Sequence, residues 1–314
     1  MKKTRMKFCG MIMILILVSI SGCASKEQSS ERESGEITET PVKTEISDES
    51  PTPVEEQSPN EGDIQVADSD IIKNDIDLSA AFHGINGCAV LYSSKDNMYS
   101  LYNANMCEQE VSPYSTFKVI STLAGLKNGI VEDASSKMNY TGEQYAIPEW
   151  NADLGLREAF QTSCIWYFRQ VIDAVGEDEI QKELTDLSYG NCDVSEWNGS
   201  NANPIEELNG FWLDSTLKIS PFEQVQVLAK IFEGDSIYNE KNVNILKEIM
   251  LIQDDGTQKI YGKTGSGSEG QAWFVGFSEK NDETKYFAIY LDDNIQKENI
   301  SGSTAKEIAL KIME

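Results

Sequence analysis

The sequence predicts an α+β fold, in which an antiparallel β-sheet is flanked by N- and C-terminal helices and interrupted by an inserted all-α subdomain. Strand-like segments occur before residue 115 and again after residue 256, helical spacing dominates at about 115–250, and a final helix closes the chain. Short links between the late strands favour antiparallel pairing. Because the sheet needs both ends of the folded region, the helical part is an insertion and not an independent domain.

Each element has its own local signal. Segments 88–92 and 98–102 are rich in strand-forming residues and are joined around Lys95-Asp96-Asn97, which predicts a hairpin. Helical spacing begins at Ser115, and a helix is predicted at 221–231 because Ser220 is a good N-cap and Pro221 fits the first turn. Aromatic and β-branched residues predict strands at 258–262, 272–277 and 286–291, and a last helix is expected at 304–313.

The first 22 residues have the pattern of an export signal. Four basic residues among the first seven precede an apolar stretch at 8–20, which is short for a membrane span. The stretch ends in Ile20-Ser21-Gly22-Cys23, and small residues before a cysteine resemble a bacterial lipoprotein processing site. The resemblance implies a signal peptide at 1–22 and a lipid on Cys23. We therefore expect an exported lipoprotein on the outer face of the cytoplasmic membrane, or on another envelope membrane.

Residues 23–70 predict an acidic, disordered tether between the lipid and a folded domain at 71–314. After Cys23 the segment is rich in Ser, Thr, Glu, Pro and Gln, and it cannot bury enough apolar surface to offset its chain entropy. The whole chain has a formal net charge of -26. Such a charge repels nucleic acid and anionic headgroups, so no nucleic-acid partner is expected.

The counts of histidine and cysteine limit the chemistry. His83 is the single histidine, so a zinc hydrolase and a Ser-His-Asp triad are disfavoured, and we expect no metal. His83 itself is interpreted as a surface or edge residue. Export permits disulfides, and a Cys88–Cys107 bridge is one arrangement that the sequence leaves open.

A serine and a lysine on one helical turn form the candidate catalytic pair. Ser115-Thr116-Phe117-Lys118 places the two side chains on one face, close to unpaired N–H groups of the first turn that can stabilise an oxyanion. The motif alone is weak, because Ser-x-x-Lys also occurs at Ser215–Lys218 and Ser303–Lys306. We interpret Ser303 as a cap of the last helix and Lys218 as a surface residue.

Other motifs distinguish the Ser115–Lys118 pair from the two coincidental Ser-x-x-Lys motifs. A Ser-x-x-Lys motif, a second serine at Ser163 and a later Lys263-Thr264-Gly265, in this order, resemble the penicillin-recognising serine enzymes. The fuller set resembles class D β-lactamases over about residues 80–312. It comprises Ser115-Thr116-Phe117-Lys118, Ser163-Cys164-Ile165, Tyr189-Gly190-Asn191, Phe211-Trp212-Leu213, Lys263-Thr264-Gly265 and Ala272-Trp273-Phe274-Val275-Gly276.

The resemblance implies a β-lactam hydrolase that works through an acyl-enzyme. A lysine of ordinary pKa is only about one part in a thousand neutral near neutral pH, so Lys118 needs an apolar pocket to act as a base. Suitable walls are Phe117, Ile165, Trp212 and Leu213. The resemblance further implies that Lys118 captures CO2, supplied as bicarbonate, and becomes a carbamate that the Trp212 N–H holds. This carboxylated Lys118 would be the general base, first for Ser115 and then for the water that releases the acyl group.

The same resemblance assigns roles to the remaining site residues. Ser115 would be the nucleophile, its N–H and that of Ser266 the oxyanion donors, and Ser163 the proton carrier beside Lys263. Thr264 and Gly265 would line the substrate site with Ile165. The class commonly has an arginine near the start of the last helix for the substrate carboxylate. Here the stretch is Ile300-Ser301-Gly302-Ser303, so Lys263, Thr264 and Ser301 are the candidates for that role.

Two other functions share these motifs. A β-lactam-sensing receptor domain would acylate without turnover, and it would need a transmembrane route for its signal. A peptidoglycan D,D-transpeptidase or carboxypeptidase would share the nucleophile, but it fits the Trp212 and Tyr-Gly-Asn context less well. Turnover of a β-lactam separates these alternatives from a hydrolase.

Overall fold

The structure is a computed structural model that describes residues 71–314 except residue 235. The predictions for the signal peptide, Cys23 and the tether concern residues outside this part of the chain. Among the described residues, no helix is long and apolar enough to span a membrane.

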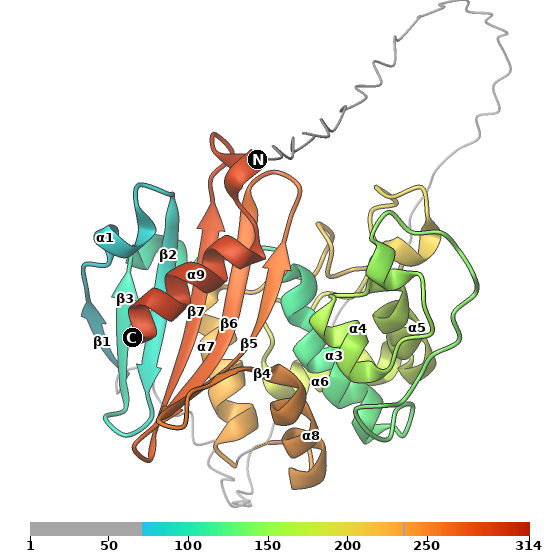
Figure 1. Cartoon of the computed structure of the whole chain (residues 1–314), viewed down its shortest axis with the longest axis horizontal. Helices are drawn as coiled ribbons and strands as arrows, with labels where there is room; N and C mark the ends of the chain where they lie inside the picture. The colour runs from blue at the N-terminus through green and yellow to red at the C-terminus, as the bar shows by residue number, and fades with distance from the viewer. Residues whose placement is uncertain (1–70, 235) are drawn as a thin grey trace, which may run out of the picture. The chain divides into compact units, whose positions relative to one another are not determined.

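A seven-stranded sheet forms the centre of the folded region (Figure 1). Its order is β1-β3-β2-β7-β6-β5-β4, so strands from both ends of the region lie side by side, as predicted. Pairing is antiparallel at every step except β1–β3, which is parallel. The strands are β1 (Ile72–Asp75), β2 (Gly87–Ser93), β3 (Met98–Tyr102), β4 (Leu251–Asp254), β5 (Gln258–Ser266), β6 (Gln271–Lys280) and β7 (Glu283–Asp292).

Helices cover both faces of the sheet and form the insertion. In chain order they are α1 (Ser79–Phe82), α2 (Ala104–Cys107), α3 (Lys118–Lys127), α4 (Leu156–Gln161), α5 (Ile165–Val175), α6 (Glu177–Leu187), α7 (Pro221–Phe232), α8 (Glu240–Met250) and α9 (Gly302–Met313). Short 3-10 turns are η2 (Tyr114–Phe117), η3 (Pro148–Trp150), η4 (Glu206–Leu208) and η5 (Lys297–Asn299).

Because successive side chains on a strand point to opposite faces of the sheet, the sheet has two separate hydrophobic cores. On β7, Phe287, Ile289 and Leu291 pack under α1 and α9, whereas Tyr286 and Tyr290 face the larger core that the insertion shares. Figure 1 shows α9 crossing one face of the sheet and α7 lying on the other. Although α7 falls within the predicted insertion, it packs on β2 and β7, so the insertion is joined to the sheet by a common core.

Local signals explain where the helices begin. Ser220 caps α7 by accepting a hydrogen bond from the Glu223 N–H at 3.2 Å, and the Glu223 carboxylate accepts one from the Ser220 N–H at 2.8 Å. The predicted cap of the last helix was wrong by two residues. Helix α9 begins at Gly302 with Ser301 as its N-cap, and Ser303 lies inside the first turn.

The structure also shows the surroundings of two of the cysteines and of the histidine. Cys88 and Cys107 are buried and carry free thiols, so the bridge that the sequence left open is not formed. The Cys107 thiol is engaged instead with the Ala89 and Tyr102 carbonyl oxygens, each at 3.4 Å. His83 is exposed, as predicted, and its Nε2 lies 2.6 Å from the Lys311 ammonium.

Candidate active site

The predicted nucleophile, Ser115, lies on the short η2 turn that leads into α3. The Ser115 Oγ is 3.0 Å from the Lys118 Nζ, so the two side chains meet as the three-residue spacing predicts. Ser115 is the second residue of the turn, where backbone N–H groups have no intrahelical partner. Tyr114, immediately before it, has a left-handed backbone with φ 49°, and its N–H donates to the Trp212 carbonyl at 3.0 Å.

Lys118 is fully buried at the base of this turn. Its side chain is inaccessible to solvent, and desolvation lowers the pKa of its amine to about 7. The ammonium position lies 5.4 Å from the centre of the Phe168 ring. An amine with this pKa is a competent proton acceptor near neutral pH, which is what the sequence required of the base.

The predicted aromatic wall surrounds the pair. Phe117 and Trp212 stack with ring centroids 5.8 Å apart, and both are buried. Ile165 and Leu213 are half-buried at the margins. Within the described residues, the Trp212 Nε1 is buried without any hydrogen-bond partner. An orphaned buried donor costs about 1–3 kcal/mol, so this N–H marks a position where an acceptor would be stabilised.

A second Ser–Lys pair faces the first across the site. The Lys263 Nζ donates to the Ser163 Oγ at 2.5 Å and to the Thr264 carbonyl at 2.9 Å. Burial first, and then the nearby Lys118 charge, hold the pKa of Lys263 well below its usual value. Ser163 has φ 57° in the link between α4 and α5, and this turn aims its hydroxyl at β5. The pair can pass a proton between a serine hydroxyl and an amine.

The strand β5 approaches the nucleophile turn closely because of a glycine. A side chain at Gly265 would stand 3.2 Å from the Pro113 carbonyl and 3.3 Å from the Thr116 methyl group. Ser266 lies at the end of the same strand, and its Oγ accepts a hydrogen bond from the Gly302 N–H at 2.9 Å. This contact ties the start of α9 to the strand that carries Lys263.

The Tyr189-Gly190-Asn191 motif has a structural role here. Gly190 has φ 53°, and a side chain there would stand 1.9 Å from the Lys218 carbonyl oxygen. The Asn191 amide donates to the Thr216 carbonyl at 2.8 Å, and the Asn191 Oδ1 accepts from the Lys218 N–H at 3.0 Å. The motif therefore fastens the segment that follows Trp212.

Two residues near the site were not predicted from the sequence. Gln224 on α7 is buried, and its Nε2 donates to the Thr116 Oγ1 at 2.9 Å and lies 3.4 Å from the Tyr189 Oη. The Tyr114 hydroxyl donates to the Asp214 carboxylate across the mouth of the site. The local sequence does not indicate the partner of either residue, because both partners are distant in the chain. For Gln224, the available signal was a glutamine on the apolar face of a predicted helix.

The other two Ser-x-x-Lys motifs do not form catalytic pairs. Ser215 donates to the Glu196 carboxylate at 2.6 Å, whereas the Lys218 ammonium donates to the Ser112 Oγ at 2.8 Å. Lys218 is half-buried and not fully on the surface as predicted. Ser303 and Lys306 both line a groove beside β5.

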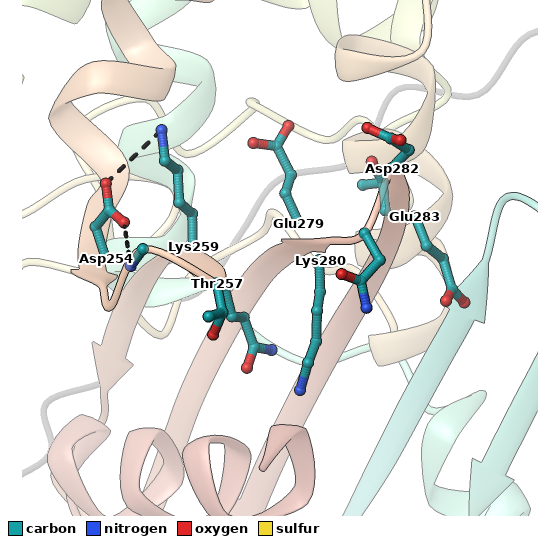
Figure 2. Close-up of a pocket in the computed structure, with 11 residues that line it drawn as sticks. Asp254, Thr257, Lys259, Glu279, Lys280, Asp282 and Glu283 are labelled. Carbon is teal, nitrogen blue, oxygen red and sulfur yellow. Dashed lines mark hydrogen bonds and ion pairs between the residues drawn. The ribbon is translucent and has the colours of Figure 1, made fainter.

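A separate polar pocket of about 490 Å³ lies at the opposite end of β5 (Figure 2). It is formed by the turns that link β4 to β5 and β6 to β7. Asp254 pairs there with Lys259 at 3.7 Å, and the pocket contains none of the predicted site residues. The predicted catalytic residues therefore lie outside this pocket.

The Penicillin binding protein transpeptidase domain family matches residues 86–314. The chain belongs to this family. Among curated proteins, it is 33% identical over 233 residues to the regulatory protein BlaR1 of Bacillus licheniformis. The alignment covers 73% of this chain but 36% of the relative, so the chain spans about a third of that protein's length. It is 31% identical to the probable β-lactamase YbxI of Bacillus subtilis, over 74% of this chain and 82% of that protein.

The similar solved structures likewise include both a β-lactamase and a receptor domain. A class D β-lactamase from Bacillus subtilis matches with a TM-score of 0.68 and 30% identity, over 76% of this chain and 94% of the other. The C-terminal domain of the Bacillus licheniformis BlaR penicillin receptor matches with a TM-score of 0.69 and 32% identity, over 78% and 96% of the two chains. The fold is therefore that of class D β-lactamases, and hydrolases and receptors both have it.

Proposed function

We propose that this protein hydrolyses β-lactam antibiotics through an acyl-enzyme on Ser115, with Lys118 as the general base, and so confers resistance. One observation carries the proposal: the buried Lys118 amine, whose pKa is lowered to about 7, lies 3.0 Å from the Ser115 hydroxyl. A neutral amine at this distance can take the hydroxyl proton as the oxygen attacks a carbonyl.

The neighbouring groups supply the remaining steps of acylation. The N–H groups of Ser115 and Ser266 would hold the oxyanion that forms on the lactam carbonyl. Ser163 would deliver a proton to the leaving nitrogen and recover one from Lys263, to which it is hydrogen-bonded at 2.5 Å. Thr264, Gly265 and Ile165 would line the bound substrate.

The lysine environment also fits a CO2-derived carbamate. Burial keeps a fraction of the Lys118 amine neutral, as reaction with CO2 requires, and the orphaned Trp212 Nε1 offers a donor to an anion. Phe117 and Leu213 would shield the group from bulk water. When formed, the carbamate would supply an anionic proton acceptor for the Ser115 hydroxyl and for the water that deacylates Ser115.

The membrane is part of the proposal. Residues 1–22 and Cys23 have the lipoprotein pattern, so we propose that a lipid on Cys23 holds the enzyme at the outer face of the cytoplasmic membrane or at another envelope membrane. Metabolic labelling with a radioactive fatty acid should label the parent protein and not the Cys23→Ala variant. Equal labelling of the two proteins would contradict the anchor.

The test of hydrolysis is steady-state turnover of a chromogenic cephalosporin by the purified protein, with and without added bicarbonate. We expect sustained hydrolysis, stimulated by bicarbonate and lost in Ser115→Ala and Lys118→Ala. Ser215→Ala is a matched control from another Ser-x-x-Lys motif. Near-normal turnover by Lys118→Ala would contradict the assignment of the base.

A second candidate is a β-lactam-sensing domain. It is favoured by the likeness to BlaR1 and to the BlaR receptor domain, at 33% and 32% identity. A sensor would give one stoichiometric burst and keep a stable adduct on Ser115. The same assay therefore separates the two functions, because a hydrolase releases many product molecules per protein.

A further inference from the structure

A groove of about 320 Å³ runs along β5 beside the catalytic centre. Lys263 and Thr264 line it, so the groove adjoins the Ser163–Lys263 pair directly. Apolar side chains of α4, α8 and β4 form one wall, including Ile252, which is 38% exposed. Ser303 and Lys306 on α9 form the other wall. The groove therefore combines an apolar wall with hydroxyl groups and a cation.

The close packing of α9 on β5 explains why Lys306 faces this groove. A side chain at Gly302 would stand 2.7 Å from the Thr264 Cβ and 3.0 Å from the Gly265 carbonyl oxygen. The first turn of the helix is thus pressed against the strand. Lys306 follows Gly302 by four residues and Ser303 by three, so these positions share one side of the helix. Figure 1 shows the start of α9 beside the end of β5.

Lys306 has no carboxylate partner among the residues that the structure describes. Several other lysines do, and Lys311 on the same helix contacts the His83 ring instead. Lys306 lines the groove next to Lys263. Its side chain is half-buried in the groove, and this partial desolvation strengthens its attraction for an anion.

The lysines inside the catalytic centre are poor substitutes for this cation. Both amines are buried and already engaged, Lys118 with the Ser115 Oγ at 3.0 Å and Lys263 with the Ser163 Oγ at 2.5 Å, and desolvation lowers the pKa of both. Ser301, which the sequence offered as another candidate for the carboxylate, has its Oγ 3.4 Å from the Thr304 Oγ1 at the start of α9 and does not line the groove.

We propose that Lys306, with Ser303 and Thr264, forms the subsite that binds the carboxylate of a β-lactam and thereby sets substrate specificity. This inference rests on the proposed reaction at Ser115, and it concerns binding and not the chemical step. The long lysine stem lets the ammonium move towards an anion beside residues 263–266 of β5, which lie beyond the part of the strand that is paired with β4. Lys306 is thus a specificity residue whose removal penalises anionic substrates alone.

The experiment compares benzylpenicillin with its uncharged methyl ester on the full chain. The second-order rate constant for acylation of Ser115 is measured by quenched-flow intact mass, which gives a signal whether or not the adduct is later hydrolysed. Lys306→Ala should lower this constant about tenfold for the acid, the size expected for one hydrogen bond to a charged group, and should leave the ester unchanged. Lys306→Arg should restore reaction with the acid.

Lys311→Ala is the matched control, since it removes a lysine from the same helix at an exposed site. Equal rate constants for Lys306→Ala and Lys311→Ala with the acid would overturn the subsite. An equal loss with acid and ester would also overturn it, because that result indicates a structural effect. Absence of any Ser115 adduct in the parent protein would instead overturn the proposed function, and the subsite with it.

Discussion

Replacing Trp212 with phenylalanine removes a buried donor that has no hydrogen-bond partner in the described part of the chain. The Nε1 is buried and unpaired, while the ring stacks on Phe117 at 5.8 Å. Phenylalanine keeps an aromatic ring in the wall and removes only the N–H and part of the ring volume. If the N–H holds a carbamate on Lys118, the loss should fall on carbamate affinity and not on folding.

The size of the expected effect follows from comparing the site with carboxylated Lys118 and with unmodified Lys118. A hydrogen bond to an anion contributes about 1.5–3 kcal/mol, so the bicarbonate concentration for half-carboxylation should rise by about 10-fold to 150-fold. In the unmodified protein the orphaned donor itself costs about 1–3 kcal/mol. Removing this donor relieves that cost and offsets much of the destabilisation caused by the cavity that the smaller ring leaves. The free energy of unfolding without CO2 should therefore change by no more than about 1 kcal/mol.

The assay is a titration with 13C-bicarbonate, in which the carbamate carbon is observed by NMR, together with urea unfolding in CO2-free buffer. Trp166→Phe is the matched control, because its Nε1 donates to the Trp150 carbonyl at 3.0 Å. That variant should lose stability by about 1–3 kcal/mol and keep the parent's bicarbonate midpoint. An unchanged midpoint in Trp212→Phe would refute the reasoning.

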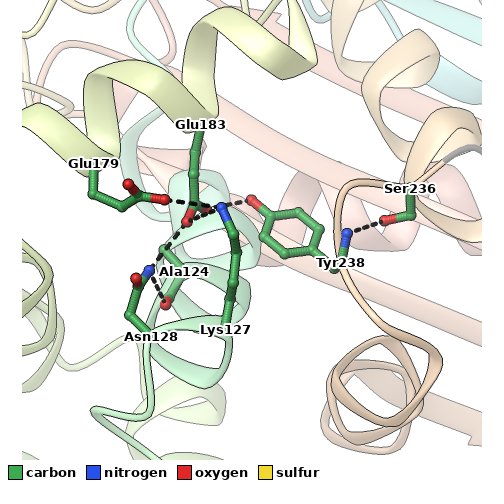
Figure 3. A network of polar contacts seen from close by, with 7 residues as sticks. All are labelled: Ala124, Lys127, Asn128, Glu179, Glu183, Ser236 and Tyr238. Carbon is green, nitrogen blue, oxygen red and sulfur yellow. Dashed lines mark hydrogen bonds and ion pairs between the residues drawn. The ribbon is translucent and has the colours of Figure 1, made fainter.

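Three further predictions concern the base, the helical core and the Tyr-Gly-Asn turn. Because the folded-state pKa of Lys118, about 7, lies below its unfolded value of 10.5, the unfolded chain holds the extra proton between these values. Stability should therefore rise from pH 7 to pH 9, and Lys118→Met should flatten this rise in urea unfolding while stopping turnover. Glu183 is fully buried and bonded to Lys127 at 3.0 Å (Figure 3), so Glu183→Ala should cost about 3 kcal/mol against less than about 1 for the more exposed Glu179→Ala, as read from unfolding midpoints. Gly190→Ala should lower the thermal midpoint severely, because its side chain would stand 1.9 Å from a backbone carbonyl, and a stable variant would contradict the tight turn.

The sequence predicted the late strands of the sheet and the proximity of Ser115 to Lys118 because both depend on local patterns. Aromatic and β-branched residues indicated the late strands, and Ser220 with Pro221 indicated the start of α7. The three-residue spacing brought Ser115 and Lys118 together on one turn. Such features are decided within a few residues of the chain, so reading them requires no knowledge of the tertiary fold.

Features that depend on distant partners could not be predicted in the same way. The parallel pairing of β1 with β3 has no local signature, and the link from Gln224 to Thr116 spans 108 positions. The free thiols of Cys88 and Cys107 likewise depend on how β2 and α2 meet. Lys306 was interpreted only as a member of a coincidental motif, since its groove exists only after α9 packs on β5.

The central claim is that Ser115 is acylated by a β-lactam and then released with the help of Lys118. The most direct measurement is a time course of intact mass after one equivalent of benzylpenicillin is added to the full chain in bicarbonate buffer. The account predicts a penicilloyl adduct on Ser115 that forms and then disappears as penicilloic acid is released. An adduct that persists undiminished on the parent protein would contradict the claim and indicate a receptor.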